Sequence, residues 1–201
     1  MITLALDTSF GTSVALLKDD QVLTEVNYPE TMTHAERIGQ AITDLLHEAK
    51  LVSAEVDRVV IGIGPGPFTG LRVGIAAAKF FSIGAKAELV GVCSLDSIAQ
   101  QYYQKGGSGS LLVTTDARRK ERFWAKYSGL TTGVPVRTVG PSVNKPEDIA
   151  ADDCETTDLV VSAAALGLIA FGLGKKVNRD VTPIYLREPD ATPGKGKKVS
   201  G

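Results

Sequence analysis

The most constraining stretch of the chain is the segment GIGPGPFTGLRVG at residues 62–74. Residues 59–63 are apolar and mostly β-branched, which predicts a buried strand. Residues 64–67 alternate glycine with proline and predict a turn, and Thr69 then stands where a helix N-cap is expected. The pattern that follows predicts a helix to about Phe81. The sequence thus predicts a strand, a tight turn and a helix that begins with small residues.

Gly70, Gly74 and Ala78 recur at four-residue intervals, so this helix carries small residues along one face. Such a stripe lets another backbone approach closely, either from a partner protein or from elsewhere in the same chain. Phosphate binding at the turn is disfavoured, because Leu71 and Arg72 stand where a phosphate-binding loop has lysine and then serine or threonine. A cation in the first helical turn also opposes the helix dipole unless an anion or an acidic group lies nearby.

Four motifs carry a resemblance to a known family: LALDTS at residues 4–9, THAER at 33–37, GPGPFTGLRVG at 64–74 and DARRKERFWAKY at 116–127. Through these motifs the chain resembles the bacterial TsaB (YeaZ) family from residue 2 to about residue 188. That family is similar to the actin-like ATPases, so the resemblance implies an α/β fold of two ribonuclease-H-like lobes with mixed β-sheets. The family usually carries serine where this chain has Pro67, which removes a hydroxyl and a backbone donor from the signature loop.

The resemblance also implies a function. Members of the family are non-catalytic subunits that bind the enzyme TsaD, with the ATPase TsaE joining the complex. Together they transfer threonylcarbamoyl to adenosine 37 of tRNAs that read codons beginning with A. We therefore expect a heterodimer with TsaD, a homodimer when the chain is alone, and contact with tRNA only through the complex. We expect no cofactor in this chain, with ATP or ADP and metal bound by the partner enzymes.

Two helices are expected to carry the partner surface. One is the amphipathic segment 33–50, which begins with a capping box of Thr33 and Glu36, and the other begins near Gly70. A surface meant for a homologous partner can also pair with its own copy, so one face is expected to serve both the homodimer and the heterodimer. The partner-binding candidates on these helices are His34, Ile38, Ile42, Phe68, Gly70, Arg72, Gly74, Ala77, Ala78 and Phe81.

Composition favours a cytoplasmic protein without a membrane segment. The 201 residues are 43% hydrophobic and carry a formal net charge of −1, which argues against nucleic-acid binding through a strong global field. No secretory or membrane-spanning pattern follows Met1, so the two cysteines are expected to be free thiols. We expect a first lobe at residues 1–105 that carries the interface helices, a smaller lobe at 106–188 and a disordered basic tail at 189–201.

Two aspartates invite a catalytic interpretation. Asp7 and Asp116 each end an apolar strand, and the similar spacing after them suggests a duplicated three-strand unit. In actin-like ATPases such carboxylates lie beside the phosphates and magnesium, so Asp7, Thr8, Ser9 and Asp116 are candidate nucleotide-proximal residues. The connectors hold few glycines, however, and no adenosine loop is evident. The alternative is that both carboxylates accept hydrogen bonds from nearby turn amides.

Metal and nucleophile chemistry lack their usual residue patterns. His34 and His47 are the only histidines, and their spacing excludes a metal-binding HxxxH pair. Cys93 lies in an apolar strand, where a buried and unreactive thiol is expected. The basic residues 118–122 are compatible with RNA contact or with a polar hairpin edge. The alternative functions are a stand-alone actin-like ATPase or sugar kinase, and an inactive peptidase-like protein.

Overall fold

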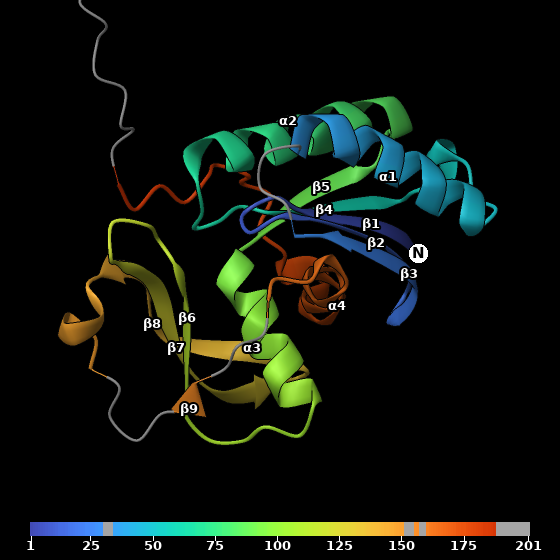
Figure 1. Cartoon of the computed structure of the whole chain (residues 1–201). Coiled ribbons are helices and arrows are strands. Elements are labelled where there is room, and N and C mark those ends of the chain that lie inside the picture. Colours follow the sequence, from blue (N-terminus) through green and yellow to red (C-terminus); the bar gives the residue numbers. More distant parts are fainter. Residues whose placement is uncertain (30–33, 151–154, 157–159, 188–201) are drawn as a thin grey trace, which may run out of the picture.

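The computed structural model describes residues 1–29, 34–150, 155–156 and 160–187. Within these residues the strands form a five-stranded sheet of order β3-β2-β1-β4-β5 and a four-stranded sheet of order β8-β7-β6-β9 (Figure 1). The strands are β1 (Ile2–Asp7), β2 (Thr12–Lys18), β3 (Gln21–Tyr28), β4 (Arg58–Gly62), β5 (Glu88–Val92), β6 (Leu111–Asp116), β7 (Arg122–Thr131), β8 (Val134–Asn144) and β9 (Glu155–Thr156). The α-helices are α1 (His34–Glu48), α2 (Phe68–Ala85), α3 (Ser94–Gln104) and α4 (Ala163–Leu173). Short 3-10 turns lie at Ser53–Glu55, Pro146–Asp148 and Gly174–Lys176.

Both sheets follow one plan. In the first, β1, β2 and β3 form an antiparallel meander, and β4 and β5 continue the sheet in parallel on the other side of β1. In the second, β6, β7 and β8 repeat the meander, and β9 pairs in parallel with β6. Asp7 and Asp116 end the corresponding strands β1 and β6. This topology confirms the expected α/β fold of two ribonuclease-H-like units with mixed sheets.

Helices cover both faces of the first sheet. α1 and α2 lie side by side on one face, and α4 covers the other (Figure 1). Because both faces are covered, β1, β2 and β4 are buried along almost their whole length, which requires their near-continuous apolar sequences. The helix α3 packs on the second sheet and also contacts α4. The division of the chain between residues 105 and 106 stays a prediction.

The two ends of α2 differ from those expected. The N-cap is Pro67 and its side chain makes no capping bond, whereas Thr69 is exposed in the first turn, so the N-cap prediction was wrong. Proline serves here because its fixed φ suits a helix start and its carbonyl accepts a hydrogen bond from the Leu71 N–H at 3.1 Å. At the other end the helix continues past Phe81 to Ala85. The added turn brings the exposed Ile83 into the helix.

Some sequence predictions fall on parts of the chain that the structure does not describe. The capping box of Thr33 and Glu36, the side chain of His34, Cys154 and the tail at 189–201 all lie outside the described side chains. The apolar residues 159–161 predict a strand, but residues 160–161 form none, and β9 lies a few residues earlier. None of the helices in the described part of the chain combines the length and hydropathy needed to cross a membrane.

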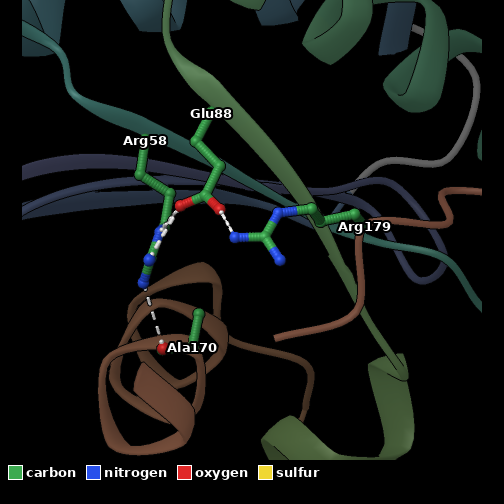
Figure 2. A network of polar contacts seen from close by, with 4 residues as sticks. All are labelled: Arg58, Glu88, Ala170 and Arg179. Carbon is green, nitrogen blue, oxygen red and sulfur yellow. Dashed lines mark hydrogen bonds and ion pairs between the residues drawn. The ribbon is translucent and has the colours of Figure 1, made fainter. Parts of the chain in front are cut away.

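An ionic network joins the first sheet to α4 and to the segment that follows α4 (Figure 2). Arg58 and Glu88 stand opposite each other on β4 and β5, and Arg58 Nε donates to Glu88 Oε2 at 2.9 Å. Arg58 Nη1 donates to the Ala170 carbonyl at 3.2 Å, and Arg179 Nη2 donates to Glu88 Oε1 at 2.6 Å. Burial alone would raise the pKa of Glu88, but the hydrogen bonds and charges of the two arginines lower it below its ordinary value of 4.5. One carboxylate therefore holds three segments together.

Replacing Glu88 with glutamine is expected to lower the free energy of unfolding by about 2 kcal/mol, because it leaves the buried Arg58 guanidinium without its counter-charge. Since the folded state depresses the pKa of Glu88, its contribution is present above pH 4.5 and is lost as the pH falls through the folded-state pKa. Denaturant unfolding of the parent and of Glu88→Gln at several pH values checks this. The two curves should converge on acidification. Glu147→Gln, at an exposed carboxylate, is the control.

Candidate partner-binding site

The inner face of α2 contacts the connector that follows β1. Gly70, Gly74 and Ala78 are buried, and the Thr8 hydroxyl donates to the Gly70 carbonyl at 2.8 Å. A Cβ atom added at Gly74 would lie closer than 3.0 Å to Thr8 Oγ1, a separation that real Cβ atoms do not show. The prediction that this stripe faces a partner was therefore wrong, because Thr8 of the same chain already fills the space beside it.

Three glycines of the signature each make room for one residue at the end of β1 or in the β1–β2 connector. A Cβ at Gly62 would collide with the Asp7 carboxylate, and one at Gly66 would lie 2.7 Å from Ser9 Cβ. Gly74 makes room for Thr8 in the same way. The glycine-rich signature and the Asp-Thr-Ser motif thus form one packed unit. The sequence contains both motifs, but their contact depends on the parallel pairing of β1 with β4.

Asp7 is committed to hydrogen bonds within this unit. It is buried, and its Oδ1 accepts from the Ser9 N–H at 2.7 Å and from the Ser9 hydroxyl at 2.5 Å. Its Oδ2 accepts from the Ser94 hydroxyl at 2.6 Å. Asp116 lies on the second sheet, is exposed and accepts from the Arg118 N–H at 3.0 Å. The turn-amide alternative therefore accounts for contacts of both carboxylates, and the structure brings Asp7, Thr8 and Ser9 together but leaves Asp116 apart.

The first connector also contacts the second sheet through an aromatic side chain. Phe10, from the first connector, lies edge-on to Phe123 of β7 with ring centroids 6.5 Å apart. The segment after α4 reaches the ends of both sheets: Ile184 N–H donates to the Ile63 carbonyl at 2.8 Å, and Arg187 Nη1 donates to the Ala117 carbonyl at 2.9 Å. Side chains and this segment therefore bridge the region between the strand-end carboxylates.

Arg72, in the first turn of α2, is stabilised by aromatic groups. Its guanidinium carbon lies 3.7 Å from the centroid of the Phe68 ring, and Nε donates to the Tyr185 hydroxyl at 3.2 Å. The Phe68 and Tyr185 rings are themselves 4.8 Å apart. A cation–π contact of this kind contributes about 0.5–1 kcal/mol at an exposed site, which offsets the unfavourable helix dipole. The sequence could not identify Tyr185 as the partner, because it lies far away along the chain.

The outer face of α2 is apolar and open to solvent. Phe80 is 76% exposed and Ile83 is 73% exposed, the two highest values among the large hydrophobic residues of the described chain. Ala76 is exposed one turn before Phe80, and the spacing places all three on one side of the helix. Ala77 and Phe81, which the sequence predicted as partner contacts, are half-buried against the core. We call Ala76, Phe80 and Ile83 the outer strip.

Sequence reasoning missed the outer strip because it ended the helix at Phe81 and followed the small residues instead. The signal was present: a phenylalanine and an isoleucine three residues apart continue the helical spacing beyond the glycines. On α1, Ile38 and Ile42 are buried in the core beneath the helix pair, so the prediction that they form a partner surface was also wrong. Arg72 stays exposed and Phe68 half-buried at the N-terminal end of α2.

Cys93 offers no nucleophile. It is a free thiol between β5 and α3, buried to 5% exposure. Burial, together with the nearby Asp96 carboxylate, raises the pKa of Cys93 to about 12. A thiol with this pKa stays protonated at neutral pH, and the thiolate is the reactive form. Peptidase chemistry at Cys93 is therefore disfavoured on physical grounds.

Comparisons with known proteins agree with this fold. The family model described as TsaD: tRNA N6-adenosine threonylcarbamoyltransferase matches residues 25–180. An uncharacterized protein of Mycobacterium tuberculosis is 37% identical over 178 residues, covering 82% of this chain and 80% of that protein. The tRNA threonylcarbamoyladenosine biosynthesis protein TsaB of Escherichia coli is 33% identical over 148 residues, covering 73% of this chain and 64% of that protein.

Among solved structures, YeaZ from Pseudomonas aeruginosa matches with a TM-score of 0.79 at 27% identity, and the match covers 92% of this chain and 100% of that chain. A second structure from Pseudomonas aeruginosa, described as similar to peptidase YEAZ, matches with a TM-score of 0.82 at the same identity. The sequence matches and the structural matches extend over most of the chain. The chain therefore belongs to the family that the TsaD model describes and, through its TsaB and YeaZ relatives, to the TsaB (YeaZ) group within it.

Proposed function

We propose that this chain is a non-catalytic subunit in the formation of threonylcarbamoyladenosine in tRNA, and that it binds TsaD through the outer strip of α2. The observation that carries the proposal is the exposure of Phe80 and Ile83 on a helix whose other face is packed on the sheet. Burying two such side chains contributes about 1.5–3 kcal/mol each, and clustered apolar anchors dominate many protein interfaces.

The family relationship supports TsaD as the protein that binds the outer strip. The TsaB relative is named for threonylcarbamoyladenosine biosynthesis, and the matching family model carries the name of TsaD itself. A partner of the same family has a corresponding helix, so the two proteins can pair about a pseudo-two-fold axis. In this proposal TsaE joins the TsaD heterodimer, the chain alone forms a cytoplasmic homodimer through the same strip, and the complex acts on adenosine 37 of tRNAs that read codons beginning with A. ATP or ADP and metal belong to the partner enzymes.

The candidate catalytic groups of the isolated chain are already engaged within its own fold. Both carboxylate oxygens of Asp7 accept hydrogen bonds from serines of the same chain, and the Cys93 thiol is held protonated by burial. Neither group is available as a base or a nucleophile without rearrangement of the core. The role that fits such a site is to hold the partner enzyme in a competent state.

The purified chain is expected to neither hydrolyse ATP nor modify tRNA, and modification should appear only when TsaD and the other components are added. Asp7→Ala should leave the background rate of ATP hydrolysis unchanged. It should lower the free energy of unfolding by about 3 kcal/mol, because it leaves buried donors without an acceptor. Asp116→Ala, at an exposed carboxylate, is the matched control and should cost less than about 1 kcal/mol. ATP turnover by the parent chain that disappears in Asp7→Ala would overturn the non-catalytic role.

A further inference from the structure

A basic groove lies at the end of the second sheet. Its volume is about 640 Å³, and its walls come from the β6–β7 turn and from the chain just after β8. Four cationic side chains line it: Arg119, Lys120, Arg122 and Lys145. Three acidic side chains, Asp116, Glu121 and Glu147, line it as well, so the four cationic groups exceed the acidic ones by one. The chain as a whole carries a net charge of −1, so this positive excess is a local feature.

Two of the three acidic residues of the lining, Glu121 and Asp116, have partners outside it. Glu121 forms an ion pair with Arg187, which lies outside the groove lining, and Asp116 accepts the Arg118 N–H. In the described part of the chain, Lys120, Arg122 and Lys145 take part in no ion pair. These three cationic groups are therefore held at the groove without an ion pair to another side chain of the described residues.

The turn that presents these groups is fixed by its backbone. Arg118, Arg119 and Lys120 all have positive φ, at 58°, 55° and 61°, a conformation that residues with a Cβ rarely adopt. The Ala117 N–H donates to the Glu121 carbonyl, and Arg187 reaches the Ala117 carbonyl from the opposite side. The basic side chains thus project from a pinned turn, which lowers the entropy cost of using them together.

We infer that this groove binds the phosphodiester backbone of RNA. Exposed, unpaired lysine and arginine side chains are the usual contacts to nucleic-acid phosphates, and they need no pocket that encloses a base. A site for a small phosphorylated molecule would instead bury most of its ligand, whereas all four cationic residues here are exposed. The inference deepens the proposed function and rests on it for the identity of the RNA, which is the tRNA substrate of the complex.

The groove and the outer strip are on different layers of the molecule. The groove belongs to the second sheet, whereas α2 covers the first (Figure 1). One chain can therefore hold TsaD on one side and give a tRNA direct contact at another. This direct contact goes beyond the expectation that tRNA is met only through the complex.

The test is a fluorescence-anisotropy titration of unmodified tRNA with the full chain, at salt concentrations from about 50 to 200 mM. The triple variant Lys120→Gln, Arg122→Gln, Lys145→Gln should bind about tenfold more weakly at the lowest salt and should reduce the slope of log K against log salt by about 2 to 3. The control removes the same charge from exposed lysines outside the groove: Lys18→Gln, Lys105→Gln, Lys175→Gln. It should change the affinity less than about twofold.

Thermal unfolding shows whether the triple variant is folded. If it is not, the single variant Lys145→Glu, outside the pinned turn, tests the groove in its place and should weaken tRNA binding. Binding of TsaD by the triple variant should match the parent. Equal tRNA binding by the groove and control variants, or no tRNA binding by the parent, would overturn the assignment of the groove as an RNA-binding site. Failure of the parent to bind TsaD, with the tRNA pattern intact, would overturn the proposed function alone.

Discussion

The double variant Phe80→Asp, Ile83→Asp is expected to bind TsaD at least about a hundredfold more weakly than the parent chain while remaining folded. Both side chains are more than 70% exposed in the monomer, so their replacement removes little packing within the chain. At a buried interface each would forfeit about 1.5–3 kcal/mol, and a hundredfold loss needs only about 2.7 kcal/mol. A binding titration by calorimetry against purified TsaD measures the effect.

The control for this prediction places an aspartate at another exposed apolar position. Val160 is 66% exposed and lies outside α2, so Val160→Asp should leave TsaD binding unchanged. Circular dichroism and thermal unfolding should show that the double variant is as stable as the parent within about 0.5 kcal/mol. If the double variant and Val160→Asp bound TsaD equally well, the outer strip would not be the partner surface.

Gly74→Leu is expected to act on the fold and not on a partner. A side chain at this position would meet Thr8, which is fully buried and bonded to the Gly70 carbonyl. Overpacking of this kind costs about 1–3 kcal/mol or more, which exceeds the gain of about 1 kcal/mol from removing a helical glycine. The melting temperature should fall by several degrees.

Gly84 provides the matched control in the same helix. A Cβ atom at Gly84 meets no other atom within 4 Å, so Gly84→Leu should keep or raise the melting temperature. TsaD binding by the folded fraction of Gly74→Leu should equal that of the parent. A stable Gly74→Leu protein that had lost TsaD binding would restore the interface role that the sequence suggested for this stripe.

The fold was largely predictable because its signals are local. Strands with both faces covered appear as continuous apolar runs. The sequence also predicts helices at 94–104 and at about 163–173, which match the observed bounds of α3 and α4. The repeated arrangement of strand, aspartate and connector predicted the duplicated three-strand unit that both sheets contain. The short strand β9 was misplaced, since two residues carry too little periodicity to identify a strand.

The site was less predictable because its contacts join distant parts of the chain. A stripe of small residues shows that something comes close, but the sequence does not say whether the neighbour is Thr8 or another protein. The pairing of β1 with β4 places the β1–β2 connector beside α2. The face of α2 with Gly74 therefore packs inward, and Phe80 lies on the outer face. The stacking of Arg72 with Phe68 and its hydrogen bond to Tyr185 likewise needed the segment after α4 to return to the N-terminal end of α2.

Light scattering of the chain alone, of TsaD alone and of their mixture tests whether one strip serves both the homodimer and TsaD binding. We expect a homodimer for the chain alone, and we expect added TsaD to replace this species with a heterodimer containing one copy of each protein. A homodimer that survived intact inside a larger assembly with TsaD would contradict the shared strip, and a mixture that eluted as two unassociated proteins would contradict the partnership itself.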